Sequence, residues 1–238
     1  MNNGVVLIAT VFKKYYDSAC LLADSIKQYY PNCKVTLFTE EKFVNKNSEV
    51  FDSVITDLPN TPDDEALSVK CRAKMWGMAN TPYDVTLYLD SDMMVVDEEF
   101  STVFDKIKDN DMLFTRITAD REYAYHDRKF GGGEFTIHGG MCLYKKTAKS
   151  FMLDWYERFK KQRLGYWWPD NVNDFPLKLQ QWDQFSLWWM INKESDKYKY
   201  LKYDFFDEDD RWNAVWTLRP DLGHAIKPII YHYNLHER

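Results

Sequence analysis

Low-complexity tracts, internal repeats and paired cysteine motifs are all missing from this sequence of 238 residues. Without a repeating unit the chain is not a solenoid or a propeller, and without biased tracts it is not a largely disordered protein. Its four cysteines are scattered and lack the spacing of a metal site. They are Cys20, Cys33, Cys71 and Cys142. We therefore expect reduced, packed thiols and a reducing compartment.

A surplus of positive charge is missing as well, because 31 lysines and arginines stand against 37 aspartates and glutamates. The net charge of −6 argues against a nucleic-acid partner, which requires clustered basic side chains. Long apolar runs are also absent. The run Val5–Ala9 is too short to span a bilayer and lacks the charged start of a signal peptide. We expect a cytoplasmic protein with no membrane span.

The first half of the chain alternates between strand and helix patterns. Continuous β-branched and apolar runs predict strands over 4–10, 34–39, 51–56 and 85–90. Apolar residues at helical spacing predict helices over 15–29 and 66–80. This order indicates an α/β fold with a mostly parallel central sheet flanked by helices. Ligands of such sheets bind beyond the carboxyl ends of the strands, where Thr10, Thr39 and Asp90 should line one crevice.

The second half has a different pattern and should form a smaller, acceptor-side subregion of the same single domain. We place the division at about residue 97 and predict strands over 111–118, 136–144 and 226–233 and helices over 147–163 and 183–193. Between the first two strands, a loop ends in Gly131-Gly132-Gly133, which we interpret as a mobile segment near the ligand. The aromatic segment from Tyr166 to Asp170 is the best candidate for an exposed sugar-stacking surface.

Two acids interrupt the most apolar part of the chain. The run Val85–Leu89 ends in Asp90-Ser91-Asp92, and apolar residues resume directly afterwards. Because alternate strand residues point to the same side, Asp90 and Asp92 should project together and Ser91 away from them. Two carboxylates at the end of a buried strand are costly without a counter-ion, and their oxygens suit Mg²⁺ or Mn²⁺. The alternative is a turn with two solvated acids.

Five segments in this order resemble the GT-A glycosyltransferases, which use nucleotide-sugar donors. Within them, the chain resembles the retaining family that includes glycogenin and bacterial lipopolysaccharide galactosyltransferases. The segments are Lys74, sixteen residues before Asp90; the motif Asp90-Ser91-Asp92; the strand Ile137–Tyr144; the run Trp182-Asp183-Gln184; and the run Tyr231-His232-Tyr233. Each match is weak alone, and their common order carries the resemblance.

The resemblance implies a metal-dependent glycosyltransferase with a GT-A fold that moves a sugar from a nucleotide diphosphate, UDP favoured, to a glycan or other hydroxyl acceptor. Mn²⁺ or Mg²⁺ would be held by Asp90, Asp92 and His232 and would stabilise the leaving diphosphate. Donor-binding residues would be Ala9, Thr10, Tyr15, Lys74, Asp90, Ser91, His138, Gly139 and Gly140. Catalytic residues facing the sugar or the acceptor would be Asp183 and Gln184.

Departures from the family pattern leave several points open. His138 replaces an asparagine that touches the donor sugar, and His236 rivals His232 as the metal ligand. Asp183 is either a general base of an inverting enzyme, a sugar contact of a retaining one, or only an acid at a helix start. Tyr15 either stacks on the base or packs in the core.

A carbohydrate-binding protein would not need the two acids at all. A sugar-1-phosphate nucleotidyltransferase would need glycines that Ala9–Lys13 lacks.

Overall fold

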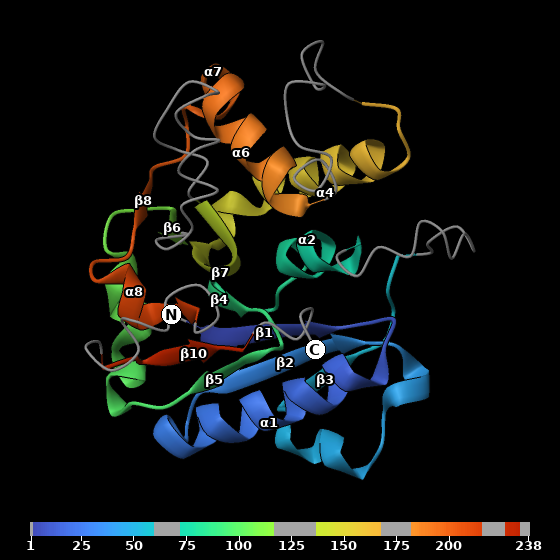
Figure 1. Cartoon of the computed structure of the whole chain (residues 1–238), viewed down its shortest axis with the longest axis vertical. Helices are drawn as coiled ribbons and strands as arrows, with labels where there is room; N and C mark the ends of the chain where they lie inside the picture. The colour runs from blue at the N-terminus through green and yellow to red at the C-terminus, as the bar shows by residue number, and fades with distance from the viewer. Residues whose placement is uncertain (1, 60–71, 117–136, 168–181, 216–226, 234–238) are drawn as a thin grey trace.

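A seven-stranded sheet forms the centre of the computed structural model, which describes residues 2–59, 72–116, 137–167, 182–215 and 227–233 (Figure 1). Its strand order is β3-β2-β1-β4-β7-β6-β8. Strand β7 runs antiparallel to both of its neighbours, and the other four pairings are parallel. The strands are β1 (Asn3–Ala9), β2 (Lys34–Thr39), β3 (Ser53–Ile55), β4 (Val85–Leu89), β6 (Met112–Arg116), β7 (Ile137–Lys145) and β8 (Tyr203–Phe205). The predicted α/β class with a mostly parallel sheet is confirmed.

Helices cover both faces of this sheet (Figure 1). Side chains of β1 alternate between two cores: Val5 and Leu7 pack on the side of α1, and Val6 and Ile8 on the side of α2. This explains the unbroken apolar run, because a strand covered on both faces has no polar side. Helix α1 (Lys13–Tyr29) lies on the first face with the short helices η1 (Glu41–Phe43), η2 (Lys46–Val50) and η4 (Glu98–Ile107). The second face carries α2 (Arg72–Ala79), α4 (Lys149–Arg163) with η5 (Lys146–Ala148) before it, α6 (Asp183–Lys193) and α7 (Ser195–Tyr198).

The strand order reverses at β1. From β1 the chain adds β2 and β3 on one side and then returns to place β4 on the other side of β1. Such a reversal opens a crevice at the carboxyl ends of the two strands that flank it. The sheet also continues across the expected division at residue 97, because β4 pairs with β7.

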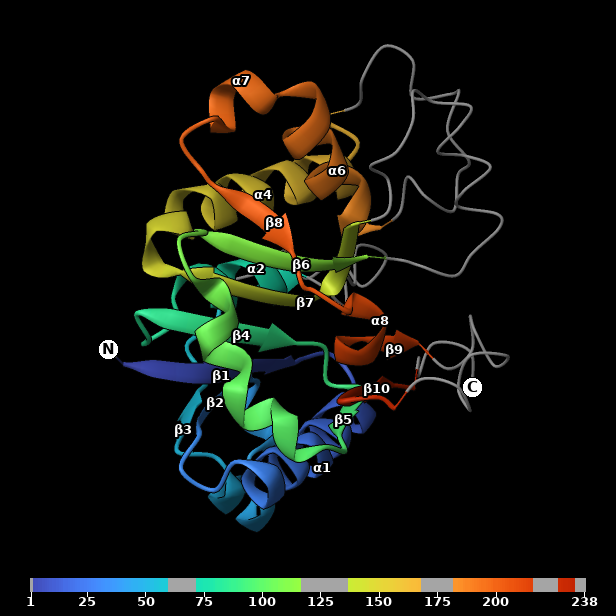
Figure 2. The ribbon, with the colours of Figure 1, turned by 90° about the vertical axis from the view of Figure 1, so that its left-hand side faces the viewer.

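A second, three-stranded sheet stands beyond these strand ends and was not predicted. It has the order β5-β10-β9 and consists of β5 (Met93–Val95), β10 (Ile230–His232) and β9 (Ala214–Val215), with α8 (Asp209–Trp212) just before β9. Figure 2 shows β5 and β10 side by side. The late strand expected over 226–233 is therefore shorter than predicted; Ile226 itself lies outside the described residues. Runs of two or three residues are too short for a period of two to reveal them.

Several expectations fall on parts of the chain that the structure does not describe. These are the first residues of the helix expected over 66–80, the end of the strand expected over 111–118, the start of that expected over 136–144, the loop with Gly131-Gly132-Gly133, most of the segment from Tyr166 to Asp170, and His236. Cys20, Cys33 and Cys142 are buried free thiols, and Cys71 lies outside the described residues. Among the helices that are described, none is long and apolar enough to cross a membrane.

The ion pairs of Asp52 give a prediction for acid stability. Burial raises the pKa of Asp52, but hydrogen bonds from Lys27, the Val35 amide and Lys34 lower it by a larger amount. The net result is a pKa of about 2 instead of 3.8. A lowered pKa stabilises the fold above the unfolded pKa, and this contribution fades as pH falls toward the folded pKa. After a discount for solvent screening, D52N should lower the free energy of unfolding by about 1 kcal/mol at pH 6. Urea unfolding at pH 6 and pH 3 should show that roughly half of this difference is gone at pH 3. A difference that is independent of pH would contradict the prediction.

Candidate active site beyond the ends of β1 and β4

The two acids of the Asp90-Ser91-Asp92 motif lie in a turn between β4 and β5 that we call the acid turn, and these two strands belong to different sheets. The expectation was that a continuing strand brings the two carboxylates to one side. This explanation is wrong, because residues 90–92 do not form a strand. They converge because the chain leaves the large sheet here and enters the small one. One ligand atom each from Asp90, Asp92 and His232 lies within 4.8 Å of the others. Asp92 and His232 are buried, and Asp90 is partly exposed.

His232 reaches these acids through the small sheet. Strand β10 pairs antiparallel with β5 and places His232 opposite Met93, while the Tyr233 amide donates to the Asp92 carbonyl over 2.8 Å. His232 Nε2 then lies 3.3 Å from Asp92 Oδ1. Neighbouring ligands of an octahedral ion with bonds of about 2.1 Å are about 3 Å apart, so this pair has the spacing of two ligands. Two carboxylates and one imidazole also form a donor set that suits Mn²⁺, so the residues present fit a divalent cation.

Lys74 joins the acid turn to the start of α6. Its Nζ lies 3.2 Å from Asp90 Oδ1 and 2.9 Å from Asp183 Oδ2, and the lysine is only 5% exposed. Burial raises the pKa of Asp90, but the charge of Lys74, with smaller effects of His232 and the Tyr88 hydroxyl, brings it below its usual value. The Tyr88 hydroxyl donates to Asp90 Oδ1 over 2.5 Å. Asp90 is therefore an ionised carboxylate at neutral pH, as a metal or donor site requires.

Gly139 and Gly140 lie in a bulge of β7 that approaches the acids. The β6–β7 register shifts here, from Phe114 opposite Cys142 to Thr115 opposite His138. A Cβ on Gly140 would come within 2.6 Å of Asp90 Oδ2, and one on Gly139 within 3.6 Å of both Lys74 Nζ and Asp183 Oδ2. The glycines allow the backbone to approach the site, and the Asp90 amide donates to the Gly140 carbonyl over 2.8 Å.

His138 stands at the beginning of this bulge as a neutral imidazole. Burial, followed by the nearby His232, lowers the pKa of His138 to about 3. The Gly140 amide donates to His138 Nδ1 over 2.9 Å, so Nδ1 is an acceptor and the ring proton resides on Nε2. The rings of His138 and His232 meet edge to face with centroids 5.1 Å apart. His138 therefore offers this site a hydrogen-bond donor, Nε2–H.

Asp183 and Gln184 begin α6, as predicted, and face the same bulge. Asp183 Oδ1 accepts the Gln184 amide over 3.0 Å, and Trp155 Nε1 donates to the Asp183 carbonyl over 3.0 Å. The Gln184 side chain donates to the Ile137 carbonyl over 3.3 Å. Asp183 thus combines the position of an acid at a helix start with an ion pair to Lys74.

The end of β1 carries the remaining predicted donor residues. Leu7 pairs with Leu89, so Ala9 and Thr10 continue beside the acid turn formed by Asp90-Ser91-Asp92. Ser91 in this turn is buried, with 6% of its surface exposed. Ala9 is fully buried, and its carbonyl accepts the Thr39 hydroxyl over 2.7 Å. Tyr15 belongs to α1, is 7% exposed and points into the core between α1 and the sheet, with its ring centroid 6.0 Å from that of Phe12. The structure thus brings together all the predicted metal and catalytic residues and leaves Tyr15 among packed side chains.

Val11 follows Thr10 and has a φ of 74°, and the Phe12 amide donates to the Thr10 carbonyl over 2.9 Å, so Val11 is the central residue of a γ-turn of the rare, strained, positive-φ form. Its amide donates to Glu40 Oε1 over 2.5 Å. Such strain collects where the surrounding structure imposes it, often at ligand sites. Neither Val11 nor Glu40 was predicted as part of the site, because strain at one residue leaves no periodic pattern in the sequence.

V11N should raise the free energy of unfolding by about 1 kcal/mol, because a positive φ is more costly for a β-branched residue than for asparagine, which adopts it several-fold more often. Urea unfolding measures the gain. V44N is the matched control, since Val44 is 38% exposed and has an ordinary φ of −63°. Equal effects of the two substitutions would show that Val11 is not strained.

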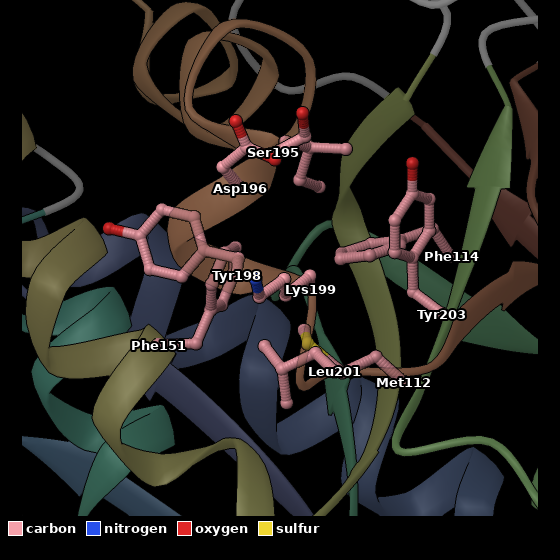
Figure 3. Close-up of a pocket in the computed structure, with 10 residues that line it drawn as sticks. Met112, Phe114, Phe151, Ser195, Asp196, Tyr198, Lys199, Leu201 and Tyr203 are labelled. Atoms are coloured by element: carbon pink, nitrogen blue, oxygen red, sulfur yellow. The ribbon is translucent and has the colours of Figure 1, made fainter.

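A separate cavity of about 230 Å³ lies between α4, α7 and the first residues of β6 and β8 (Figure 3). Apolar side chains such as Phe114, Phe151 and Tyr198 form most of its wall. None of the site residues predicted from the sequence lines this cavity, and we assign it no ligand.

Comparison with known proteins identifies the fold. No protein-family model matches the chain, and no curated protein sequence matches it either. Solved structures do match. The galactosyltransferase LgtC, in complex with donor and acceptor sugar analogs, is 15% identical with a TM-score of 0.57 over 97% of this chain and 87% of its own. Mouse xyloside xylosyltransferase 1 is 13% identical with a TM-score of 0.58 over 100% and 99%. A glycosyltransferase involved in glycosylation of the major capsid of PBCV-1 is 14% identical with a TM-score of 0.55 over 98% and 93%.

The chain therefore has the GT-A glycosyltransferase fold, as the resemblance of its motifs implied.

Proposed function

We propose that this protein is a metal-dependent glycosyltransferase. It transfers a sugar from a nucleotide diphosphate donor, UDP-sugar favoured, to a glycan or another hydroxyl acceptor, with retention of configuration. The observation that carries the proposal is the cluster of Asp90, Asp92 and His232 beside the Lys74–Asp183 ion pair, at the strand reversal of a GT-A fold. A parallel sheet binds nucleotides at this position.

The residues divide into two groups by their surroundings. Asp90, Asp92 and His232 would hold Mn²⁺ or Mg²⁺, and the bound ion supplies positive charge to the leaving diphosphate. Lys74 supplies a second positive charge from α2 and keeps Asp90 ionised. Ala9, Thr10 and Ser91, which stand at the ends of β1 and β4, would contact the nucleoside.

The other group faces the sugar. Gly139 and Gly140 leave room beside the acids, and His138 presents Nε2–H as a fixed donor to a sugar hydroxyl. Asp183 and Gln184 would orient the donor sugar near the acceptor. LgtC and the xylosyltransferase, by their names, transfer different sugars, so the shared fold leaves the choice of sugar to such side chains.

Retention is proposed because Asp183 is already engaged by Lys74 at 2.9 Å and by the Gln184 amide at 3.0 Å. A general base of an inverting enzyme must instead reach the proton of the acceptor hydroxyl. Proton NMR of the freshly formed product would reveal the anomer. An inverted anomer would transfer the role of general base to Asp183.

Thermal unfolding with a panel of nucleotide sugars, each with and without Mn²⁺, tests the function. We expect a UDP-sugar with Mn²⁺ to raise the melting temperature most, since a ligand at a hundred times its Kd stabilises by about 2.7 kcal/mol. Slow donor hydrolysis should accompany binding. A carbohydrate-binding protein would be stabilised by free glycans alone, without nucleotide or metal, and that outcome would overturn the proposal.

A further inference from the structure

A chain of buried hydrogen bonds connects the side of His232 that faces away from the acids to the large sheet. His232 Nδ1 lies 3.1 Å from Asn213 Oδ1, and Asn213 Nδ2 donates to Thr115 Oγ1 over 2.9 Å. The exposed fractions of Thr115, Asn213 and His232 are 0%, 3% and 6%. The three residues come from β6, from the junction of α8 and β9, and from β10.

This arrangement determines which nitrogen of His232 carries the proton. Because the Asn213 amide uses Nδ2 toward Thr115, its oxygen faces His232. An amide oxygen only accepts hydrogen bonds, so Nδ1 of His232 must carry a hydrogen. A neutral imidazole has one such hydrogen, and therefore its Nε2 bears a lone pair.

The lone pair on Nε2 is directed at the acids. Nε2 lies 3.3 Å from Asp92 Oδ1, and its ligand position falls within 4.8 Å of that of Asp90. Two lone-pair-bearing atoms repel each other at this distance unless a cation lies between them. The tautomer set by Asn213 thus suits a metal ligand and opposes a simple His232–Asp92 hydrogen bond.

We propose that Asn213 and Thr115 are positioning residues that hold His232 in the Nδ1–H tautomer, so that Nε2 is ready to bind a divalent cation before the cation arrives. The proposal rests on the metal site of the proposed function. Groups that hydrogen-bond the second nitrogen of a metal-binding histidine orient the ring, and their loss typically weakens metal binding 10- to 100-fold. Thr115 acts one step further out: its hydroxyl accepts from Asn213 Nδ2, and with the amide in this orientation Asn213 Oδ1 faces His232.

The tautomer can be observed directly without metal. Long-range ¹H–¹⁵N correlation spectra of the full chain in EDTA at pH 8, with His232 assigned through H232Q, distinguish the two neutral forms. We expect the Nδ1–H form in the wild-type protein and in T115S, which keeps the hydroxyl. In T115V the amide can turn, and the Nε2–H form should appear. The Nε2–H form in the wild-type protein would overturn the proposal.

Affinity for Mn²⁺, measured by the EPR signal of free Mn²⁺, tests the consequence. T115V should bind Mn²⁺ about ten-fold more weakly than the wild-type protein, and T115S equally well. In the double variant T115V/N213D, a carboxylate accepts from Nδ1 whichever way it turns, so both the tautomer and the affinity should return. A merely structural role of Thr115 predicts no such recovery. Equal tautomers and equal affinities in T115V and T115S would overturn the proposal.

The two hypotheses fail in different ways. If the wild-type protein binds no Mn²⁺, the proposed metal site is wrong, and the NMR spectra still report the tautomer. If Mn²⁺ binds and the tautomer is Nε2–H, the metal site stands and the role of Asn213 is wrong.

Discussion

D92A is expected to bind Mn²⁺ at least 100-fold more weakly than the wild-type protein and to lose about 10³-fold in kcat/KM, or about 4 kcal/mol of transition-state stabilisation. Asp92 is buried and its Oδ1 lies 3.3 Å from His232 Nε2, so D92A removes one of the three side chains that would hold the cation. Titrations of Mn²⁺ and UDP, followed by donor turnover, measure both losses.

The fold of D92A should remain intact. Asp92 repels Asp90, and removing this repulsion should leave the melting temperature in EDTA equal or higher. D92N provides a variant of equal size without the charge, and D105A a control at an exposed acid. If D92A bound UDP as tightly as the wild-type protein and turned over the donor without metal, the Asp90-Ser91-Asp92 turn would have no part in the mechanism.

K74M is expected to lower the free energy of unfolding by about 3–5 kcal/mol, the cost of leaving a buried charge without its partner. Lys74 is 5% exposed and lies between the carboxylates of Asp90 and Asp183, the second of which is itself 8% exposed. Methionine has a similar length and no charge, so the substitution removes the ion pairs with little change in packing. Urea unfolding at pH 7 in EDTA measures the loss.

A double-mutant cycle separates the ion pair from packing. Adding D183N to K74M should restore about 2 kcal/mol, because the second substitution removes a carboxylate that the first left unpaired. The matched control is K13M, since Lys13 and Asp17 form an exposed ion pair whose loss should cost about 0.5 kcal/mol or less. Additive effects of K74M and D183N would show that their contact contributes no stability.

Much of the fold was predictable because its cause is local. The runs of β1 and β4 have no charged residue on either face and are mostly β-branched, aliphatic or aromatic, and this composition alone indicates strands covered on both faces. The start of α6 at Asp183 was also predicted, since an acid is favoured in the first turn of a helix. The order of such segments was enough to indicate the α/β class and the end of the sheet at which the Asp90-Ser91-Asp92 turn lies.

Other parts of the site could not be predicted from local patterns. Strands β5, β8, β9 and β10 have two or three residues each and show no usable periodicity. The bulge at Gly139 and Gly140 depends on how β6 and β7 pair, and the strained φ of Val11 depends on its surroundings. Asn213 belongs to no motif, and its role is visible only once Thr115 and His232 lie beside it.

The sequence by itself determined that two acids end a buried parallel strand, and that Lys74, Asp183 and a late histidine accompany them in a GT-A order. Tertiary structure decided which atoms meet: the β5–β10 pairing brings His232 to Asp92, and Asn213 sets the tautomer of His232. The physical reason is a difference in range. Hydrophobic alternation and helix starts arise from neighbouring residues, whereas a hydrogen bond between distant segments forms only after the folding of the whole core has offset the entropy of closing the intervening loops.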